Sequence, residues 1–145
     1  MALFPAGTKP NISVISDETN WSRSTSYPSG STVPIDTWTS ISYLNLDAGT
    51  YYLSASVNIK STEMSNGDYP QLYHRICKQS SGGNLETLVS GYIICAGNQI
   101  PIGIIATFTT PITVYLQVNP YANGDSAVVA RVYDVGCHAI KLGTT

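Results

Sequence analysis

The sequence has 145 residues and a formal net charge of −2, a length that suits one domain with its own hydrophobic core. A hydrophobic content of 43% excludes a disordered chain, and the weak negative charge excludes a general attraction to nucleic acid or anionic lipid. Only 11% of the residues are charged, whereas 17 are Ser, 15 are Thr and 10 are Tyr. Thr and Tyr favour strands, and strong helix formers are scarce, so this composition predicts an all-β protein.

The N-terminal stretch, residues 1–7, has neither the basic nor the long apolar segment of a signal peptide. The longest apolar run, residues 100–106, is interrupted by Pro and Gly and is too short to span a bilayer. We therefore expect no secretory leader and no membrane insertion. Three cysteines without CxxC spacing, Cys77, Cys95 and Cys137, indicate buried free thiols in preference to disulfides.

Apolar and polar residues alternate with a period of two along most of the chain, as in half-buried strands. The clearest case is the segment 51–59, in which Tyr51, Leu53, Ala55, Val57 and Ile59 share one face. From the N-terminus onward, the predicted strands are 11–16, 37–46, 51–59, 71–78, 85–95, 103–109, 112–118, 128–133 and 138–142.

Turn residues separate these strands. Gly and Ser at 80–83 predict a hairpin, residues 65–70 predict a flexible loop, and residues 120–125 predict a second hairpin connection. Residues 17–33 are polar and weakly patterned, which fits either a long loop or an edge segment. About eight to ten short strands predict an antiparallel β-sandwich with jelly-roll topology. We expect residues 1–145 to form a single domain, with 1–34 as a candidate extended or loop-rich N-terminal segment.

Residues for catalysis are sparse, and we expect neither an enzyme nor a cofactor. His74 shares a strand face with apolar neighbours, which favours a packed histidine over a catalytic base. His138 follows Cys137 directly, and adjacent residues of a strand point to opposite faces, so these two form no Cys–His pair. We predict no metal site. A calcium site at Asp68, Asn123 and Asp125 remains a weakly supported alternative, because the sequence has no calcium-loop pattern.

Tyrosines on strand faces opposite the predicted core favour contact with other subunits. Tyr52 and Tyr115 lie among Ser, Thr and Gln, and Tyr133 shares its face with Arg131. Such faces carry little charge, which suits contact between identical subunits, because like charges would repel there. We predict these four residues at an interface between identical subunits. The alternative is that the tyrosines complete the solvent face of an ordinary sheet.

Aromatic and amide side chains in the predicted loops are candidates for ligand binding. Rings stack on sugars, and amides and hydroxyls bond to sugar hydroxyl groups. The predicted ligand-binding residues are Trp38, Tyr69, Tyr121, Asn123 and Asp125, and Trp21 is a further loop ring of the same kind. For each of them, local packing is the alternative.

Residues 47–59 resemble a strand of trimeric jelly-roll heads, which place Gly two positions before a core Tyr and an apolar residue two positions after it. Gly49, Tyr51 and Leu53 match that pattern. The stretch 112–118, the Gly-Asp turn at 124–125 and the strand ending at 143 are similar to the closing strands of the viral versions. Over residues 35–143, the sequence thus resembles the tumour-necrosis-factor-like and complement-globular-head-like domains, including the heads of bacteriophage tail-fibre and receptor-binding proteins.

This resemblance implies a homotrimer in which one sheet of each subunit faces the threefold axis and apical loops contact the ligand. It leads us to expect a phage virion surface protein, either a tail-fibre or receptor-binding head or a capsid head fibre. Such a protein is made in the host cytoplasm, exposed on the virion after lysis, and surrounded by other virion proteins. We expect an adhesin for bacterial surface glycans or proteins. The alternatives are a structural capsid decoration protein and a cellular carbohydrate-binding lectin.

Overall fold

The computed structural model of the chain describes residues 18–20, 22–23, 28–80, 82–94 and 96–143, which form ten β-strands and no helix. All pairings between these strands are antiparallel. Within the described residues there is no helix of the length and hydropathy needed to cross a membrane. The all-β prediction is confirmed.

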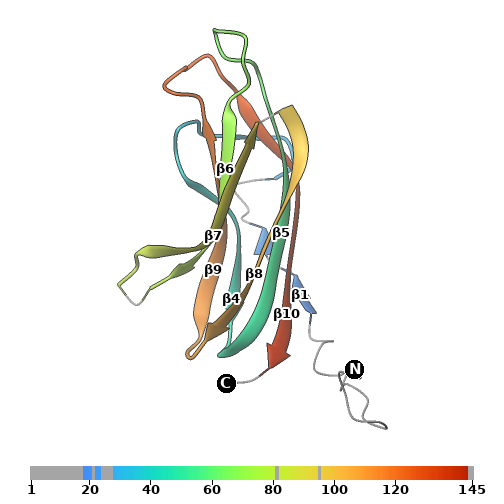
Figure 1. Cartoon of the computed structure of the whole chain (residues 1–145), viewed down its shortest axis with the longest axis vertical. Helices are drawn as coiled ribbons and strands as arrows, with labels where there is room; N and C mark the ends of the chain where they lie inside the picture. The colour runs from blue at the N-terminus through green and yellow to red at the C-terminus, as the bar shows by residue number, and fades with distance from the viewer. Residues whose placement is uncertain (1–17, 21, 24–27, 81, 95, 144–145) are drawn as a thin grey trace, which may run out of the picture.

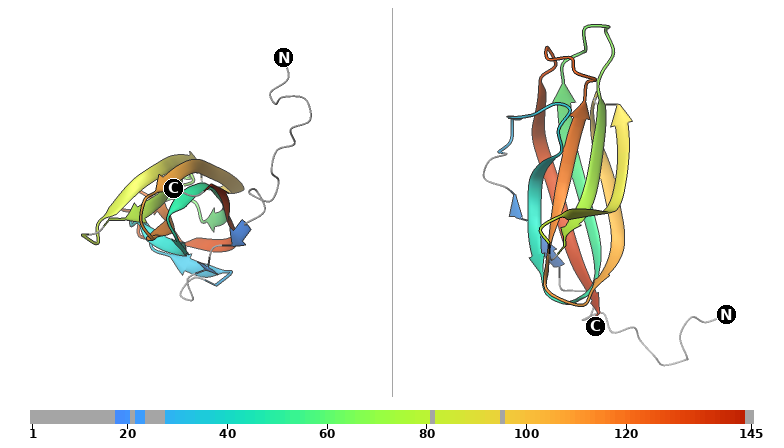
Figure 2. Two further views of the ribbon diagram at one scale, coloured as in Figure 1. Left: turned by 90° about the horizontal axis from the view of Figure 1, so that it is seen from below. Right: turned by 90° about the vertical axis from the view of Figure 1, so that its left-hand side faces the viewer.

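The strands form two sheets that face each other as the layers of a sandwich (Figures 1 and 2). The first, sheet A, has the order β1-β10-β5-β8, and β3 pairs with β10 on the same side as β1. The second, sheet B, has the order β2-β4-β9-β6-β7. The strands of sheet A are β1 (Glu18–Asn20), β3 (Ser31–Val33), β5 (Gly49–Ser61), β8 (Ala96–Phe108) and β10 (Ala130–Gly143). Those of sheet B are β2 (Ser22–Arg23), β4 (Thr39–Leu46), β6 (Gln71–Gln79), β7 (Leu85–Ile94) and β9 (Ile112–Tyr121).

The core lies between the sheets and follows the period-two pattern of the sequence. Tyr51, Leu53, Ala55 and Val57 of β5 are buried, whereas the residues that alternate with them face outward. The Tyr51 hydroxyl donates a hydrogen bond of 3.2 Å to the carbonyl of Asp47, which satisfies its polar end inside an apolar layer. From sheet B, Val114, Leu116 and Val118 of β9 close the core, and all three are fully buried. The predicted alternation of β5 and β9 is confirmed.

Three predicted elements differ from the structure. The segments 128–133 and 138–142 belong largely to one long strand, β10, whose register shifts between Val132 and Val135, so an irregularity replaces the expected turn. The loop after β9 is no hairpin, because β9 lies in sheet B and β10 in sheet A. Strand β8 begins at Ala96, seven residues before the predicted start at 103. Segment 17–33 includes the short strands β1, β2 and β3, and β1 and β2 lie at the ends of the two sheets, which fits the edge-segment alternative. The strand predicted at 11–16 lies outside the described residues.

One end of the sandwich carries three loops, residues 34–38, 62–70 and 122–129, and is called the loop end below (top of Figure 1). The opposite end carries the tight connections between β4 and β5 and between β8 and β9. The hairpin predicted at 80–83 is confirmed: it joins β6 to β7, and Gly83 has a φ of 80°.

Candidate functional site

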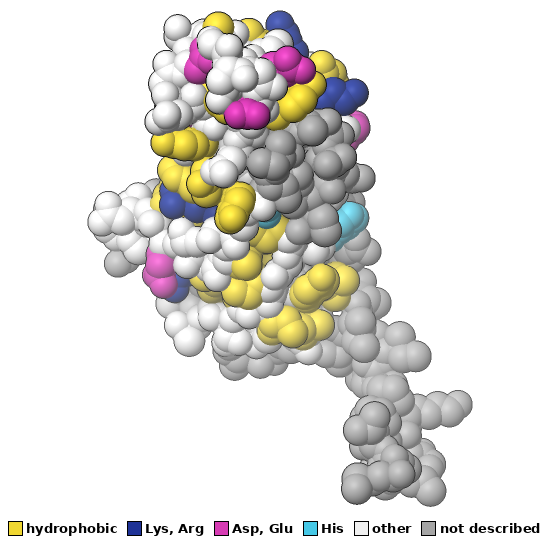
Figure 3. All heavy atoms as spheres, turned by 45° about the horizontal axis from the view of Figure 1, so that its top comes forward, with side chains coloured by type: hydrophobic (Ala, Val, Ile, Leu, Met, Phe, Trp, Pro, Cys, Tyr) yellow, Lys and Arg dark blue, Asp and Glu magenta, His cyan; other side chains and the backbone are white. Residues whose placement is uncertain are grey.

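The loop end contains a hollow of about 560 Å³ between the 62–70 loop and the end of β9. Tyr69 and Tyr121, with 38% and 41% of their surface exposed, lie in its wall. The Tyr121 hydroxyl donates to the Asn123 amide oxygen at 3.1 Å. In Figure 3, acidic side chains gather at this end, with hydrophobic and tyrosine side chains below them. The hollow is lined by Met64, Gly67, Asp68, Tyr69, Gln71, Tyr121 and Asn123.

The Asp36 carboxylate fixes the loop that follows β9. Its two oxygens accept the backbone N–H groups of Ala122, Asn123 and Gly124 at 2.8, 3.1 and 2.7 Å. Asp36 and Asn123 have φ values of 54° and 51°, a left-handed conformation that Asp and Asn adopt more readily than most residues. Asn123 is therefore held in place before any ligand arrives.

Asp125 connects the two loops of the hollow instead of lining it. Its carboxylate accepts the Ser65 backbone N–H at 2.6 Å and the Ala127 backbone N–H at 3.1 Å. These hydrogen bonds stabilise the ionised carboxylate and lower the pKa of Asp125 below its ordinary value, and the hydrogen bonds from Ser65 contribute most. Since Ser65 belongs to the 62–70 loop, Asp125 fixes that loop against the loop after β9.

Two further tyrosines extend the aromatic surface of the hollow onto sheet B. Tyr73 lies between Tyr92 and Tyr121, with ring centroids 5.5 and 5.9 Å away. Its hydroxyl donates to the Gln71 side-chain oxygen at 2.7 Å. These residues, Tyr73, Tyr92 and Tyr121, are called the tyrosine row below. Sequence reasoning missed Tyr73 and Tyr92, although both have the outward parity of their strands.

Among the predicted ligand residues, Tyr69, Tyr121 and Asn123 meet at the hollow, whereas Trp38 does not line it. Trp38 precedes β4, and the guanidinium carbon of Arg75 lies 4.1 Å from the centroid of its ring. Trp21 lies outside the described residues. The structure thus brings three of the five predicted residues into one site and places Asp125 behind it.

The predicted interface residues lie on both outer faces of the sandwich. Three of them lie on sheet A, on strand faces opposite the core: Tyr52, Arg131 and Tyr133. The Nζ atom of Lys60 lies 5.2 Å from the centroid of the Tyr133 ring. Tyr115 lies on the outer face of sheet B, and its hydroxyl donates to Gln79 at 3.0 Å. A single flat subunit interface can therefore include at most three of the four predicted residues, namely the three on sheet A.

On the outer face of sheet A, the outward positions of β5 from Tyr52 to Asn58 carry no charged side chain. Tyr52 and Ile105, directly paired across these strands, are 40% and 63% exposed. The Tyr52 ring covers Gly103, where an added Cβ atom would lie 3.0 Å from the tyrosine hydroxyl. Beside it is a shallow hollow of about 310 Å³, which Ser54, Ser56 and His138 help to line. Exposed apolar groups of this kind mark contact surfaces.

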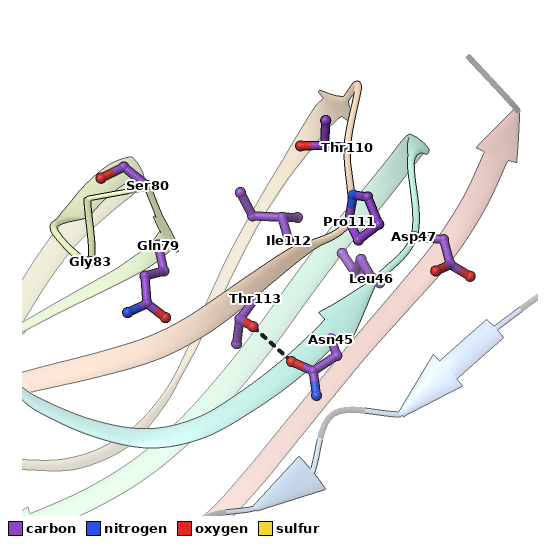
Figure 4. A pocket seen from close by; sticks show the side chains of 10 residues that line it. All are labelled: Asn45, Leu46, Asp47, Gln79, Ser80, Gly83, Thr110, Pro111, Ile112 and Thr113. Carbon is purple, nitrogen blue, oxygen red and sulfur yellow. Dashed lines mark hydrogen bonds between the residues drawn. The ribbon is translucent and has the colours of Figure 1, made fainter.

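A larger hollow, about 660 Å³, lies at the opposite end of the sandwich (Figure 4). Asp47 provides the one carboxylate among the lining residues of this hollow, and none of these residues is aromatic. The Thr113 hydroxyl donates a hydrogen bond of 2.7 Å to the side-chain oxygen of Asn45. With neither a ring for stacking nor a cation, it is a weaker candidate than the loop end. Its lining residues are Asn45, Leu46, Asp47, Gln79, Ser80, Gly83, Thr110, Pro111, Ile112 and Thr113.

Two of the residues considered for catalysis, His74 and Cys77, are packed into the sandwich, whereas His138 is exposed. His74 is buried, as predicted; burial lowers its pKa, and its Nδ1 atom has no hydrogen-bond partner. Cys77 is a buried free thiol, also as predicted, and burial raises its pKa. Cys95 and the side chain of Cys137 lie outside what the structure describes. Within the described part, no group of three or more His, Cys, Asp or Glu residues is placed to hold a metal ion.

No protein-family model matches the sequence. No curated protein matches it either. The fold, in contrast, is similar to solved structures. Eiger TNF from S. frugiperda aligns with a TM-score of 0.61 and 7% identity, over 88% of this chain and 93% of that one. The globular domain of zebrafish complement 1qA aligns with a TM-score of 0.51 and 13% identity, over 88% of this chain and 98% of that one. The chain therefore has the jelly-roll fold of the tumour-necrosis-factor-like and complement-globular-head-like domains.

Proposed function

We propose that the protein is a homotrimeric adhesion head that binds surface glycans through the hollow at its loop end. The observation that carries the proposal is that two exposed tyrosines, an amide and a carboxylate meet there, at Tyr69, Tyr121, Asn123 and Asp68. Rings stack on the apolar faces of sugars, while amide and carboxylate groups bond to sugar hydroxyls. The site has the chemistry of a saccharide-binding surface.

The loops are rigid enough for recognition. Asp36 holds three consecutive backbone N–H groups, and Asp125 holds the neighbouring loop. A loop that is ordered before binding loses less entropy when a ligand arrives, so more of the contact energy appears as affinity. This order supports a binding role for the hollow.

Self-association supplies the second part of the proposal. The face of sheet A around Tyr52 and Ile105 exposes apolar surface without a charged side chain on the outward positions of β5 from Tyr52 to Asn58. Such a face is suited to a partner of the same sequence. Three hollows at one end of a trimer increase the apparent affinity for a repetitive surface by about 10² to 10⁴.

The proposed setting is a bacteriophage virion, where the head binds bacterial surface glycans or proteins as part of a tail fibre or capsid fibre. It comes from the sequence resemblance to viral heads, and the uncharged, hydroxyl-rich composition supports it. A purely structural decoration protein is the alternative, and it differs in that its hollow binds nothing.

The proposal is tested by binding of the purified protein to an array of bacterial surface oligosaccharides. Tyr121→Ala removes a ring of the hollow, and Tyr43→Ala is the matched control, a tyrosine of similar exposure (39%) that does not line the hollow. Asn123→Gly removes the amide and tolerates the positive φ.

We expect at least one saccharide to bind, with about tenfold weaker affinity in Tyr121→Ala and Asn123→Gly and unchanged affinity in Tyr43→Ala. Melting temperatures identify any variant that loses binding by unfolding. Absence of binding to every saccharide, or equal affinity in all three variants, would refute the proposed function.

A further inference from the structure

Arg75 carries a positive charge that no carboxylate neutralises in the part of the chain that the structure describes. The ion pair on the same strand joins Lys78 to Glu86 and leaves Arg75 out. The Nε atom of Arg75 donates to the Gln117 side-chain oxygen at 2.9 Å, and Nη1 donates to the Thr87 hydroxyl at 3.3 Å. A guanidinium has five N–H donors, so three remain for a ligand within the described surroundings.

The guanidinium is held in one place. Gln117 is 95% buried and also donates from its amide nitrogen to the Ser40 hydroxyl at 2.9 Å, which determines which end of the amide faces Arg75. The ring of Trp38 packs against the guanidinium at 4.1 Å from its centroid. An arginine fixed in this way has already lost its rotamer freedom and is pre-organised to bind an oxyanion.

Arg75 also lies in line with the hollow. Gln71, Tyr73 and Arg75 are alternate residues of β6 and share its outer face. Alternate residues are about 6.6 Å apart, so Arg75 follows Gln71 at about 13 Å along the strand. Tyr73, the middle residue of the tyrosine row, lies between Gln71 and Arg75 on this face. The surface therefore runs from the hollow, over an aromatic ring, to a fixed cation.

The charges along this path differ in sign at its two ends. Asp68 lines the hollow and repels an anionic group there, whereas Arg75 attracts one. The distance of about 13 Å along β6 from Gln71, at the hollow, to Arg75 exceeds the screening length of about 8 Å at physiological salt. The charge at each end therefore acts on a different part of a bound ligand. A ligand with one negative group at the end distant from the hollow fits this arrangement.

We infer that the surface from the hollow to Arg75 binds an acidic saccharide, with a sugar carboxylate paired to Arg75 and a neighbouring ring stacked on Tyr73. A carboxylate matches the planar fork of a guanidinium better than other sugar groups do. This inference rests on the proposed function and adds the ligand class: glycans containing uronic or sialic acid. A free inorganic anion offers related chemistry, and the experiment separates the two.

The probes are tetragalacturonic acid, a sialic acid tetramer and the methyl ester of each, which keeps the rings and removes the charge. Inorganic sulfate is added as a competitor. Binding is followed by the fluorescence of Trp38 in a Trp21→Phe background, since the chain has two tryptophans. The variants are Arg75→Gln and, as a matched control that removes one positive charge from the same strand, Lys78→Gln.

We expect at least one acid to bind about tenfold to a hundredfold more tightly than its ester. Arg75→Gln removes this preference, whereas Lys78→Gln keeps it. In the Trp21→Phe background with Arg75 intact, added salt weakens binding of the acid and leaves the ester unchanged, which tests the inference without a substitution in the site. Sulfate competes only at concentrations far above those of the acid.

Equal affinity for acids and esters, or a preference that survives Arg75→Gln, overturns the inference. Sulfate that binds as tightly as the acid also overturns it, because the site then recognises an anion alone. If the acids fail to bind while neutral saccharides bind in the Tyr121-dependent manner, only the inference is refuted. If no saccharide binds at all, the proposed function is refuted as well.

Discussion

Replacing Asp36 tests how the loop after β9 is held. Its carboxylate accepts three backbone N–H groups from residues 122–124, and no other described side chain bonds to these three groups. Asp36→Ala removes all three hydrogen bonds and places Ala at a φ of 54°. Asp36→Asn is the matched control, because Asn keeps one acceptor oxygen and tolerates the left-handed conformation.

The expected loss follows from these contacts. A hydrogen bond contributes about 0.5–1.5 kcal/mol, and exposure of the site favours the lower end, so three contribute about 2 kcal/mol. The left-handed conformation costs Ala about 1 kcal/mol more. We expect Asp36→Ala to lower the free energy of unfolding by about 3 kcal/mol and Asp36→Asn by about 1 kcal/mol. For a chain of this size, 3 kcal/mol lowers the melting temperature by about 6–12 °C.

Urea denaturation at fixed protein concentration measures these changes, and hydrogen exchange detects the loosened amides of residues 122–124. In Asp36→Ala these amides should exchange faster, while those of β5 in the core remain protected. If Asp36→Ala is as stable as the natural chain, or if Asp36→Asn loses as much as Asp36→Ala, the carboxylate does not hold the loop in the way described.

Two other predictions concern the core and the outer face of sheet A. Burial lowers the pKa of His74 below 6.5, so protonation favours the unfolded chain; stability is complete above pH 6.5 and falls as the pH decreases below it. His74→Gln should flatten this dependence below pH 6.5. If the free energy of unfolding changes with pH equally in His74→Gln and in the unsubstituted chain, the assignment is contradicted. Gly103→Ala places a Cβ atom 3.0 Å from the Tyr52 hydroxyl and 3.3 Å from the Leu53 carbonyl. It should weaken trimer association relative to Gly82→Ala, whose Cβ atom makes an ordinary contact of 4.0 Å with the Asn84 side-chain nitrogen. Association constants from light scattering that are equal in these two variants would exclude this face as the interface.

The core could be predicted from the sequence because burial repeats with the parity of a strand. Tyr51, Leu53 and Val57 alternate with Ser and Asn, and each of the three lies in the core. Local turn chemistry was equally informative at Gly83 and Gly124, which both take a positive φ. Such signals need only a few neighbouring residues.

The residues of a turn do not show whether the two strands that it connects lie in the same sheet. Asn123 and Gly124 identify a turn, yet nothing nearby shows that β9 and β10 lie in different sheets. The loop between them is held by Asp36, 86 to 88 positions away in the sequence, whose carboxylate accepts its backbone N–H groups. Long β10 was also divided in the prediction, since the register shift after Val132 interrupts the alternation.

The candidate site was predicted in part. Three residues were predicted from their aromatic or amide side chains in predicted loops, and they line one hollow: Tyr69, Tyr121 and Asn123. Arg75 and Tyr73 were missed, because a single arginine in a strand has no motif and its significance comes from Trp38, in the loop before β4, and from Gln117 on β9. Trp38, chosen as a loop ring, instead packs against that arginine.

The mass of the assembled protein in solution tests the central claim, a homotrimeric binding head, most directly. Light scattering on a sizing column, run at micromolar concentration, measures that mass without any assumption about shape. The account predicts a particle of three times the 15.5 kDa of one chain. A particle with the mass of one chain at that concentration would contradict it.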